Sequence, residues 1–277
     1  MSIYKIPIGP LVEDFINYTV SNFKPFFEGI AAVILFIHGI IEAALFIVPP
    51  WVAIPIVVFL TWRFASRSTG LFALISLSLI WNLRLWDVSI ETLGLVITAS
   101  LISLMIAIPL GILVAENRIV AQLMTPILDF LQTMPRFIYL IPGVIVFGIG
   151  TVPGIIATIT LAIPPPVRLT ALGLTQVDRE VIEAGEAFGC SRWQLLTKIK
   201  LPLSMPSLML GVCQCVMMSL SMVVIAAMIG AGGLGVNILI AINRLRAGEG
   251  LEAGLGIVVI AIIIDGLAKG FIKELKN

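Results

Sequence analysis

Charged residues are scarce in this sequence. Only 12% of its 277 residues are Asp, Glu, Lys or Arg, whereas soluble domains carry roughly 25%. Hydrophobic residues make up 59%, and the mean hydropathy is +1.12. A single globular core does not bury that much apolar surface. The composition therefore excludes an ordinary soluble domain and predicts a polytopic membrane protein.

Residues that build metal and catalytic sites are also few. The chain has one histidine, His38, and three cysteines without CxxC or Cys/His spacing, so we expect no metal or redox site. Cys213 and Cys215 lie in an apolar run and are predicted to be buried thiols, and His38 to be a structural residue. The P-loop pattern G-x-x-x-x-G-K-[ST] is missing. A net charge of +1 gives no basis for binding nucleic acid. We therefore expect a non-enzymatic chain that binds no cofactor itself.

Long charge-free runs locate the membrane helices, each of which needs about 20 apolar residues. The run 92–115 predicts one span. The runs 137–167 and 201–243 are too long for one span, and their glycines and prolines at 148–154 and 230–235 predict turns that divide them. Further spans are expected at 51–64, 70–86 and 251–272.

The N-terminal segment 1–50 is expected to differ from the transmembrane domain 51–272. Residues 11–24 predict a surface amphipathic helix. Residues 29–49 carry His38 and Glu42 and form either an eighth span or a scaffold helix near the interface. The expected fold is an all-α membrane bundle with seven or eight transmembrane helices.

Basic residues indicate the orientation of the chain. One crossing per expected span places four basic clusters on the same side, which the positive-inside rule assigns to the cytoplasm. Their members are Arg63, Arg67, Arg118, Arg168, Arg179, Arg192, Lys198, Lys200, Lys269, Lys273 and Lys276. The opposite loops are near 87–91, 148–154 and 235–250, although Arg244 and Arg246 lie in the last of them.

One polar segment, 175–202, interrupts the apolar chain on the side assigned to the cytoplasm. Thr175 to Asp178 predicts a capped helix start, and Gly189 is suited to a left-handed residue at the helix end. Ser191 to Gln194 predicts a capping box that restarts a helix, and Pro202 is expected to end that helix and begin the next span. The segment is therefore predicted to be two short helices with a bend at Gly189. Apolar contacts for a partner are expected from Val181, Phe188 and Trp193.

The spacing of this segment also carries a family resemblance. It reads Glu-Ala-Gly, three residues, Gly, nine residues, Ile, one residue, Leu-Pro. This resembles the EAA loop of the permease subunits of binding-protein-dependent ABC importers, with Gly in place of the third-position Ala. The resemblance implies a type I importer permease in which the loop docks on an ATPase through Glu183, Ala184, Gly185, Glu186, Gly189, Ile199, Leu201 and Pro202.

Four further blocks, 131–135, 139–142, 220–226 and 228–235, resemble the permeases for glycine betaine, proline betaine and choline. The resemblance implies an importer of compatible solutes for osmoprotection in the bacterial cell membrane. It implies a permease homodimer, two ATPase subunits that bind ATP and Mg, and an extracytoplasmic binding protein. Two alternatives are a permease for another amino acid or amine, such as methionine, and an ion-coupled secondary transporter. A membrane enzyme is more remote, because the sequence shows no catalytic constellation.

Candidate pathway or gate residues are Met134, Pro135, Arg136, Tyr139, Gly230, Gly232, Gly233 and Gly235. Arg136 is expected in the middle of a span over 126–148, where a charge is costly, so it faces a wet pathway, snorkels toward the interface or pairs with Asp129. The glycines either line an outer gate or permit tight packing. Aromatic residues are expected in the membrane interface rather than in a betaine cage; they are Tyr139, Trp51, Trp62, Trp81 and Trp86.

Overall fold

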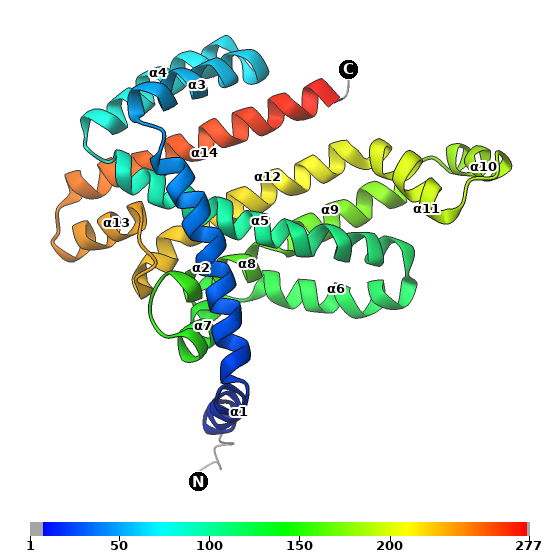
Figure 1. Ribbon diagram of the computed structural model, residues 1–277, viewed down its shortest axis with the longest axis horizontal. Helices are drawn as coiled ribbons and strands as arrows, with labels where there is room; N and C mark the ends of the chain where they lie inside the picture. The colour runs from blue at the N-terminus through cyan, green and yellow to red at the C-terminus, as the bar shows by residue number, and fades with distance from the viewer. Residues whose placement is uncertain (1–7, 276–277) are drawn as a thin grey trace, which may run out of the picture.

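The computed structural model describes residues 8–275, and all regular secondary structure within that range is helical (Figure 1). Residues 1–7 of the N-terminal segment and Lys276 of the last basic cluster lie outside the described residues. The first helices are α1 (Ile8–Asn22), α2 (Lys24–Phe46), α3 (Pro50–Leu60), which continues as a π-helical segment η1 (Thr61–Ala65), α4 (Arg67–Asn82), α5 (Trp86–Glu116) and α6 (Arg118–Thr133).

The second half of the chain is equally helical. Its elements are the 3-10 segment η2 (Arg136–Tyr139), α7 (Leu140–Phe147), α8 (Thr151–Ala162), α9 (Pro164–Thr175), α10 (Arg179–Ala187), α11 (Arg192–Gln194), the π-helical segment η3 (Leu195–Lys200), α12 (Leu201–Ala226), the 3-10 segment η4 (Ala227–Ile229), α13 (Leu234–Asn243) and α14 (Ala247–Leu275). The turns expected at 148–154 and 230–235 are confirmed, since the chain leaves the helical conformation at 148–150 and 230–233.

Five helices among the described residues are long and apolar enough to cross a membrane, and a bent pair makes a sixth. The five cover Lys24–Ile47, Trp86–Glu116, Thr151–Thr175, Arg192–Ile229 and Ala247–Ile272. Pro50–Ala65 and Leu234–Asn243 are shorter apolar helices. Together these elements agree with the expected seven or eight membrane helices, but the span expected at 70–86 is not among them, because α4 covers only Arg67–Asn82. By length and composition α2 qualifies as a span, and Figure 1 shows it crossing α5 at a steep angle.

The bent pair corrects the expectation of one continuous span over 126–148. α6 ends at Thr133, and the axis then turns by 111° before η2 and α7. Met134 adopts an extended conformation (ψ 136°) because the residue before a proline is driven out of the α region, and Pro135 is extended as well. Arg136 therefore lies at the corner and is exposed, rather than in mid-helix.

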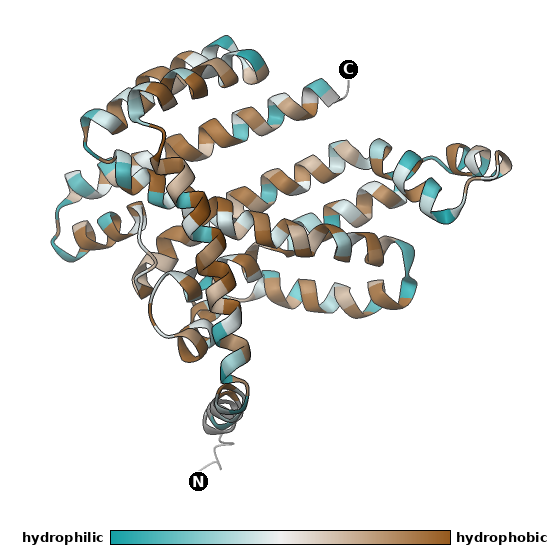
Figure 2. Cartoon of the chain, in the orientation of Figure 1, coloured by the Kyte–Doolittle hydropathy of each residue, from teal (hydrophilic) through white to brown (hydrophobic). Residues whose placement is uncertain are grey.

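Polar residues gather at the two ends of the helices, as Figure 2 shows. The α3–α4 and α5–α6 corners, the α10–α11 loop and the last turns of α14 lie at one end, and the α4–α5 and α13–α14 corners lie at the other (Figure 1). The described members of the four basic clusters are therefore at one end, as the span order predicted. Figure 2 shows apolar residues along the helices between these ends.

Small residues bring α9 close to α5 and α12. An added Cβ atom at Gly111 of α5 would lie 2.6 Å from the Cβ of Thr170 on α9 and 2.8 Å from the carbonyl oxygen of Val167. At Gly173 of α9 it would lie 2.8 Å from the Cβ of Ser207 on α12. Hydrophobic burial does not drive helices together within lipid, so such close backbone approach and interhelical hydrogen bonds stabilise the bundle.

This packing predicts that Gly111→Ala destabilises the protein by about 1–3 kcal/mol, because the added methyl group meets backbone and a β-branched side chain. The control is Gly254→Ala on α14, where an added Cβ atom meets nothing within 4 Å. Alanine favours a helix over glycine, so the control is expected to be neutral or stabilising. Thermal unfolding of the purified variants in detergent measures both, and equal stability of the two would contradict the close approach.

Candidate coupling loop and outer gate

The coupling loop, residues 175–202, contains the bend expected at Gly189. Gly189 has a φ of +79°, a conformation that favours glycine. The amide of Cys190 donates to the carbonyl of Gly185 (3.1 Å), and the amide of Gly189 donates to that of Glu186 (2.9 Å). This pair of hydrogen bonds is the Schellman motif, which satisfies the last carbonyls of α10 and fixes the direction in which the chain leaves it.

The start of α10 differs from the expected capping box. Thr175 is the last residue of α9, and its hydroxyl donates to the carbonyls of Ala171 and Leu172, both at 3.0 Å. α10 begins at Arg179, and its N-cap residue Asp178 makes no side-chain capping bond. The prediction was wrong because the hydroxyl of Thr175 bonds back to the preceding turn, an alternative open to Ser and Thr side chains.

The capping box at Ser191 is confirmed, with its side chain accepting from the amide of Gln194 (3.3 Å) and the Gln194 side chain accepting from the amide of Ser191 (2.8 Å). Pro202 does not end the helix that starts there, since helical structure continues from Arg192 to Ile229. Leu195–Lys200 is π-helical. In a regular α-helix the ring of Pro202 would clash with a carbonyl group of the preceding turn. We attribute the continuity of the helix to the wider π-helical turn, which avoids that clash.

The two halves of the coupling loop pack against each other. Gly185 is buried, and an added Cβ atom there would lie 2.6 Å from the Cδ1 of Ile199 and 2.8 Å from the Cδ2 of Leu195. The structure thus brings together residues from both ends of the predicted docking motif. Glu183, Ala184, Glu186 and Gly189 are exposed on α10 and at its end, and Leu201 and Pro202 lie in the first turn of α12.

The outer surface of the loop is apolar at its tip. Phe188 is 91% exposed, and Trp193 and Val181 are also exposed. The Glu183 carboxylate accepts from Arg179 at 3.1 Å, but both side chains are solvated and such pairs contribute little stability. Exposed aromatic residues at the tip of this polar loop mark a surface that fits a protein partner.

One ion pair connects the coupling loop to α5, and a second joins α9 to α6 outside the loop. Lys200 donates to Glu116 at the end of α5 (2.6 Å), and Arg168 of α9 pairs with Asp129 of α6. Asp129 is therefore not the partner of Arg136, which forms no ion pair with any described residue. The sequence did not reveal these contacts, because Lys200 and Glu116 are 84 positions apart.

The glycine-rich segment at the opposite end joins η4 to α13, and three of its glycines, Gly230, Gly232 and Gly233, have positive φ. The Gly233 amide donates to the Glu91 carboxylate (3.1 Å), and the Leu234 amide donates to the Thr92 hydroxyl oxygen (2.9 Å). An added Cβ atom at Gly233 would lie 2.7 Å from that oxygen. Gly235 lies in the first turn of α13, packed against α12 and η4. We refer to residues 230–235 as the outer loop.

A polar cavity of about 350 Å³ lies beside the outer loop, between α2 and α5, and is lined in part by Glu91 and Gly232. His38 also lines it and is buried, with its Nδ1 3.2 Å from the Thr98 hydroxyl and its Nε2 3.7 Å from the Glu42 carboxylate. The expectation of a hydrogen-bonded structural histidine is confirmed. Glu91 and Thr92 were not identified from the sequence, because their partners in the outer loop are 142 positions away.

Tyr139 was expected in the membrane interface, and this was wrong. Its side chain is buried against Ala157, Leu161 and Met222, and its hydroxyl has no hydrogen-bond partner among the described residues. Met134 is half-buried beside this cluster, whereas Pro135 and Arg136 are exposed at the corner. The exposed tryptophans Trp51, Trp62 and Trp81 fit an interface position, and Trp86 is half-buried.

Comparison with known proteins identifies the class to which this architecture is similar. A family model described as "Binding-protein-dependent transport system inner membrane component" matches residues 107–275, which contain the coupling loop and the outer loop.

Three curated relatives are similar over nearly the whole chain. The glycine betaine/carnitine transport permease protein GbuB of Listeria monocytogenes is 44% identical, over 98% of each chain. The glycine betaine transport system permease protein OpuAB of Bacillus subtilis is 41% identical, over 99% of this chain and 97% of the relative. The glycine betaine/proline betaine transport system permease protein ProW of Escherichia coli is 42% identical, over 98% of this chain and 77% of the relative.

Among solved structures, the inward-facing MetNI methionine ABC transporter is similar in fold. One of its chains aligns with a TM-score of 0.62 and 20% identity, over 68% of this chain and 94% of that chain. At this identity the likeness shows the fold alone.

The geometry of the outer loop predicts that Thr92→Val speeds hydrogen exchange of the Leu234 amide about tenfold, because a buried amide loses its acceptor. Thr92 is 0% exposed, so the isosteric valine changes little besides the hydroxyl group. Exchange measured by mass spectrometry on a peptide covering 230–236 tests this.

The matched control is Thr158→Val, a buried threonine whose hydroxyl donates only to Gly154 of its own helix (2.7 Å). Exchange over 230–236 is expected to remain unchanged in this variant. Equal effects of the two substitutions would show that the Thr92 hydroxyl does not anchor the loop.

Proposed function

The chain belongs to the family of binding-protein-dependent transport system inner membrane components, and on that premise we propose that its cargo is glycine betaine or a closely related quaternary amine. It is a multi-pass membrane protein and the non-catalytic permease subunit of an ABC importer, whose ATP hydrolysis takes place on separate ATPase subunits. Because the chain belongs to this family, we discard the alternative of an ion-coupled secondary transporter that the sequence left open.

The cargo proposal rests on one observation, the 41–44% identity over nearly the whole chain to permeases named for glycine betaine transport. The methionine alternative has weaker support, because the methionine transporter resembles this chain at 20% identity. Betaines are compatible solutes, so the proposed role is osmoprotection.

We propose that two copies of this chain assemble with two ATPases and receive cargo from an extracytoplasmic binding protein. ATP binding draws the ATPases together, and each moves a coupling loop. Helical structure runs unbroken from Arg192 in that loop to Ile229 at the outer loop. At 1.5 Å per residue this helix is about 57 Å long, well beyond the roughly 30 Å of hydrocarbon in a bilayer. The additional length of this helix places the coupling loop outside the membrane, where an ATPase reaches it.

Tyr139 is our candidate for a cargo contact within the bundle. A buried hydroxyl without a partner is costly and marks a place where water or a ligand belongs. The phenol group can donate to the carboxylate of a betaine, whereas the ring is packed against apolar neighbours.

Reconstituted transport tests the coupling part of this proposal. Phe188→Ala is expected to lower betaine uptake and the stimulation of ATPase activity by about thirtyfold, the effect of removing an interface anchor worth about 2 kcal/mol. Both are measured in proteoliposomes that contain the permease, its ATPase and its binding protein.

The matched control is Phe36→Ala on α2, a phenylalanine that is 70% exposed and outside the coupling loop. It is expected to leave uptake unchanged. Normal coupling in Phe188→Ala would contradict docking at the tip of the loop. Uptake that persists without ATP and collapses with the proton gradient would overturn the importer assignment.

The cargo contact predicts a selective effect of Tyr139→Phe. Loss of the hydroxyl is expected to lower kcat/KM for glycine betaine about tenfold. Transport of choline, which has no carboxylate, is expected to change little. Tyr18→Phe on the surface of α1 is the control, since Tyr18 is exposed. An equal loss for both cargoes would indicate a packing role instead.

A further inference from the structure

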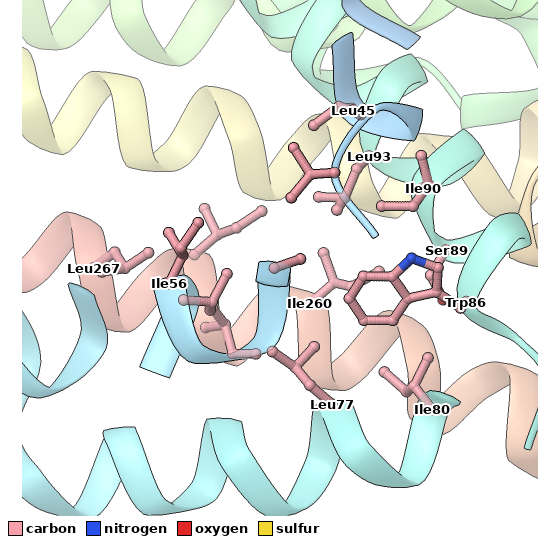
Figure 3. Close-up of a pocket in the computed structure, with 15 residues that line it drawn as sticks. Leu45, Ile56, Leu77, Ile80, Trp86, Ser89, Ile90, Leu93, Ile260 and Leu267 are labelled. Atoms are coloured by element: carbon pink, nitrogen blue, oxygen red, sulfur yellow. The ribbon is translucent and has the colours of Figure 1, made fainter. Parts of the chain in front are cut away.

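An apolar pocket of about 340 Å³ lies outside the coupling loop and the outer loop (Figure 3). α2, α3, α4, α5 and α14 all contribute to its wall. Figure 3 shows Leu77 and Ile80 of α4 on one side, Ile56 of α3 and Leu267 of α14 toward one end, and Trp86 of α5 toward the other. The proposed transport function uses none of these residues.

The apolar residues that line the pocket restrict what it can bind. Thirteen of its fifteen residues are aliphatic, and the other two are Trp86 and Ser89. The Ser89 hydroxyl already donates to the Leu85 carbonyl (2.7 Å). Water needs two or more polar partners in a cavity, so this pocket does not hold ordered water. A hydrocarbon group fits it.

The size of the pocket narrows the occupant further. A dry apolar cavity of about 150 Å³ takes one benzene molecule, so this volume accommodates about twice as much hydrocarbon, on the order of a dozen carbon atoms. A helix of a second chain is about 10 Å across and does not fit. A single unbranched chain does.

Lipid tails around the protein are unbranched hydrocarbon chains of this kind. Ile56 lines the pocket and is 49% exposed, so the pocket reaches the protein surface there. The outward faces of α3, α4 and α14 around it carry exposed apolar residues, among them Phe59, Leu71, Ile75 and Ile262. In a membrane these faces meet lipid tails. We propose that the pocket binds one acyl chain of a membrane phospholipid, which fills the space between the α3–α4 hairpin and helices α5 and α14.

Photolabelling tests this proposal. The full chain is reconstituted in vesicles that contain a phosphatidylglycerol with a diazirine near the end of one acyl chain, irradiated, and mapped by peptide mass spectrometry. We expect labelling of peptides that contain 53–57 and 260–267 to exceed labelling at exposed Ile75 at least fivefold. Ala53→Phe, which fills the pocket, is expected to reduce that excess to the Ile75 level, and so is Val57→Phe.

Leu71→Phe is the matched control, since Leu71 is 56% exposed on α4 and is not part of the pocket lining. It is expected to preserve the excess. Pocket labelling no higher than at Ile75 would overturn the proposal, and so would an excess that survives both filling variants when these purify as monodisperse protein. Labelling requires no transport, so its outcome is separate from that of the uptake experiments.

Discussion

Main-chain hydrogen bonding in an apolar solvent is the constraint on which this structure depends. A chain in lipid must satisfy every amide and carbonyl internally, so a break in a helix is tolerated only where other groups replace the lost partners. The break at 230–233 meets this condition through Glu91 and Thr92 of α5. The break at 148–150 meets it through the Gly150 amide, which donates to the carbonyl of Ile229 (2.8 Å). Both breaks in the outer half are thus tied to each other and to α5.

α5 also holds the other end of the bundle. Its Ser100 donates to Ser219 of α12 (3.0 Å) in the middle of the membrane, and Glu116 pairs with Lys200 below it. α5 therefore contacts the helix Arg192–Ile229 near its start and in its middle, and through Glu91 and Thr92 it holds the loop that follows. Side-chain hydrogen bonds between membrane helices are worth only about 0.6 kcal/mol on average. Contacts of this kind position two helices without preventing their relative movement.

The features predicted from sequence are those decided by neighbouring residues. The span over 92–115, the bend at Gly189 and the capping box at Ser191 each follow from a local pattern, and all three are present. The failures depend on packing. The burial of Tyr139 depends on α8 and α12. The helix continues past Pro202 because a π-helical segment precedes the proline, and no residue pattern indicates that segment. Glu91 and Thr92, which hold the outer loop, are 142 positions from their partners, and a single sequence gives no signal for a contact at that separation.

Gly185, the one departure from the family pattern within the coupling motif, has a structural explanation. An alanine at this position would bring its methyl group against the ends of the Ile199 and Leu195 side chains. Both side-chain ends are flexible. Alanine would therefore be accommodated if these side chains rotated and α10 moved away from η3. Glycine lets the two halves close on each other, and the Schellman bonds at Gly189 fix their angle. The departure therefore affects how closely α10 packs against η3 within the coupling loop, and it leaves the exposed surface of Phe188 and Trp193 unaltered.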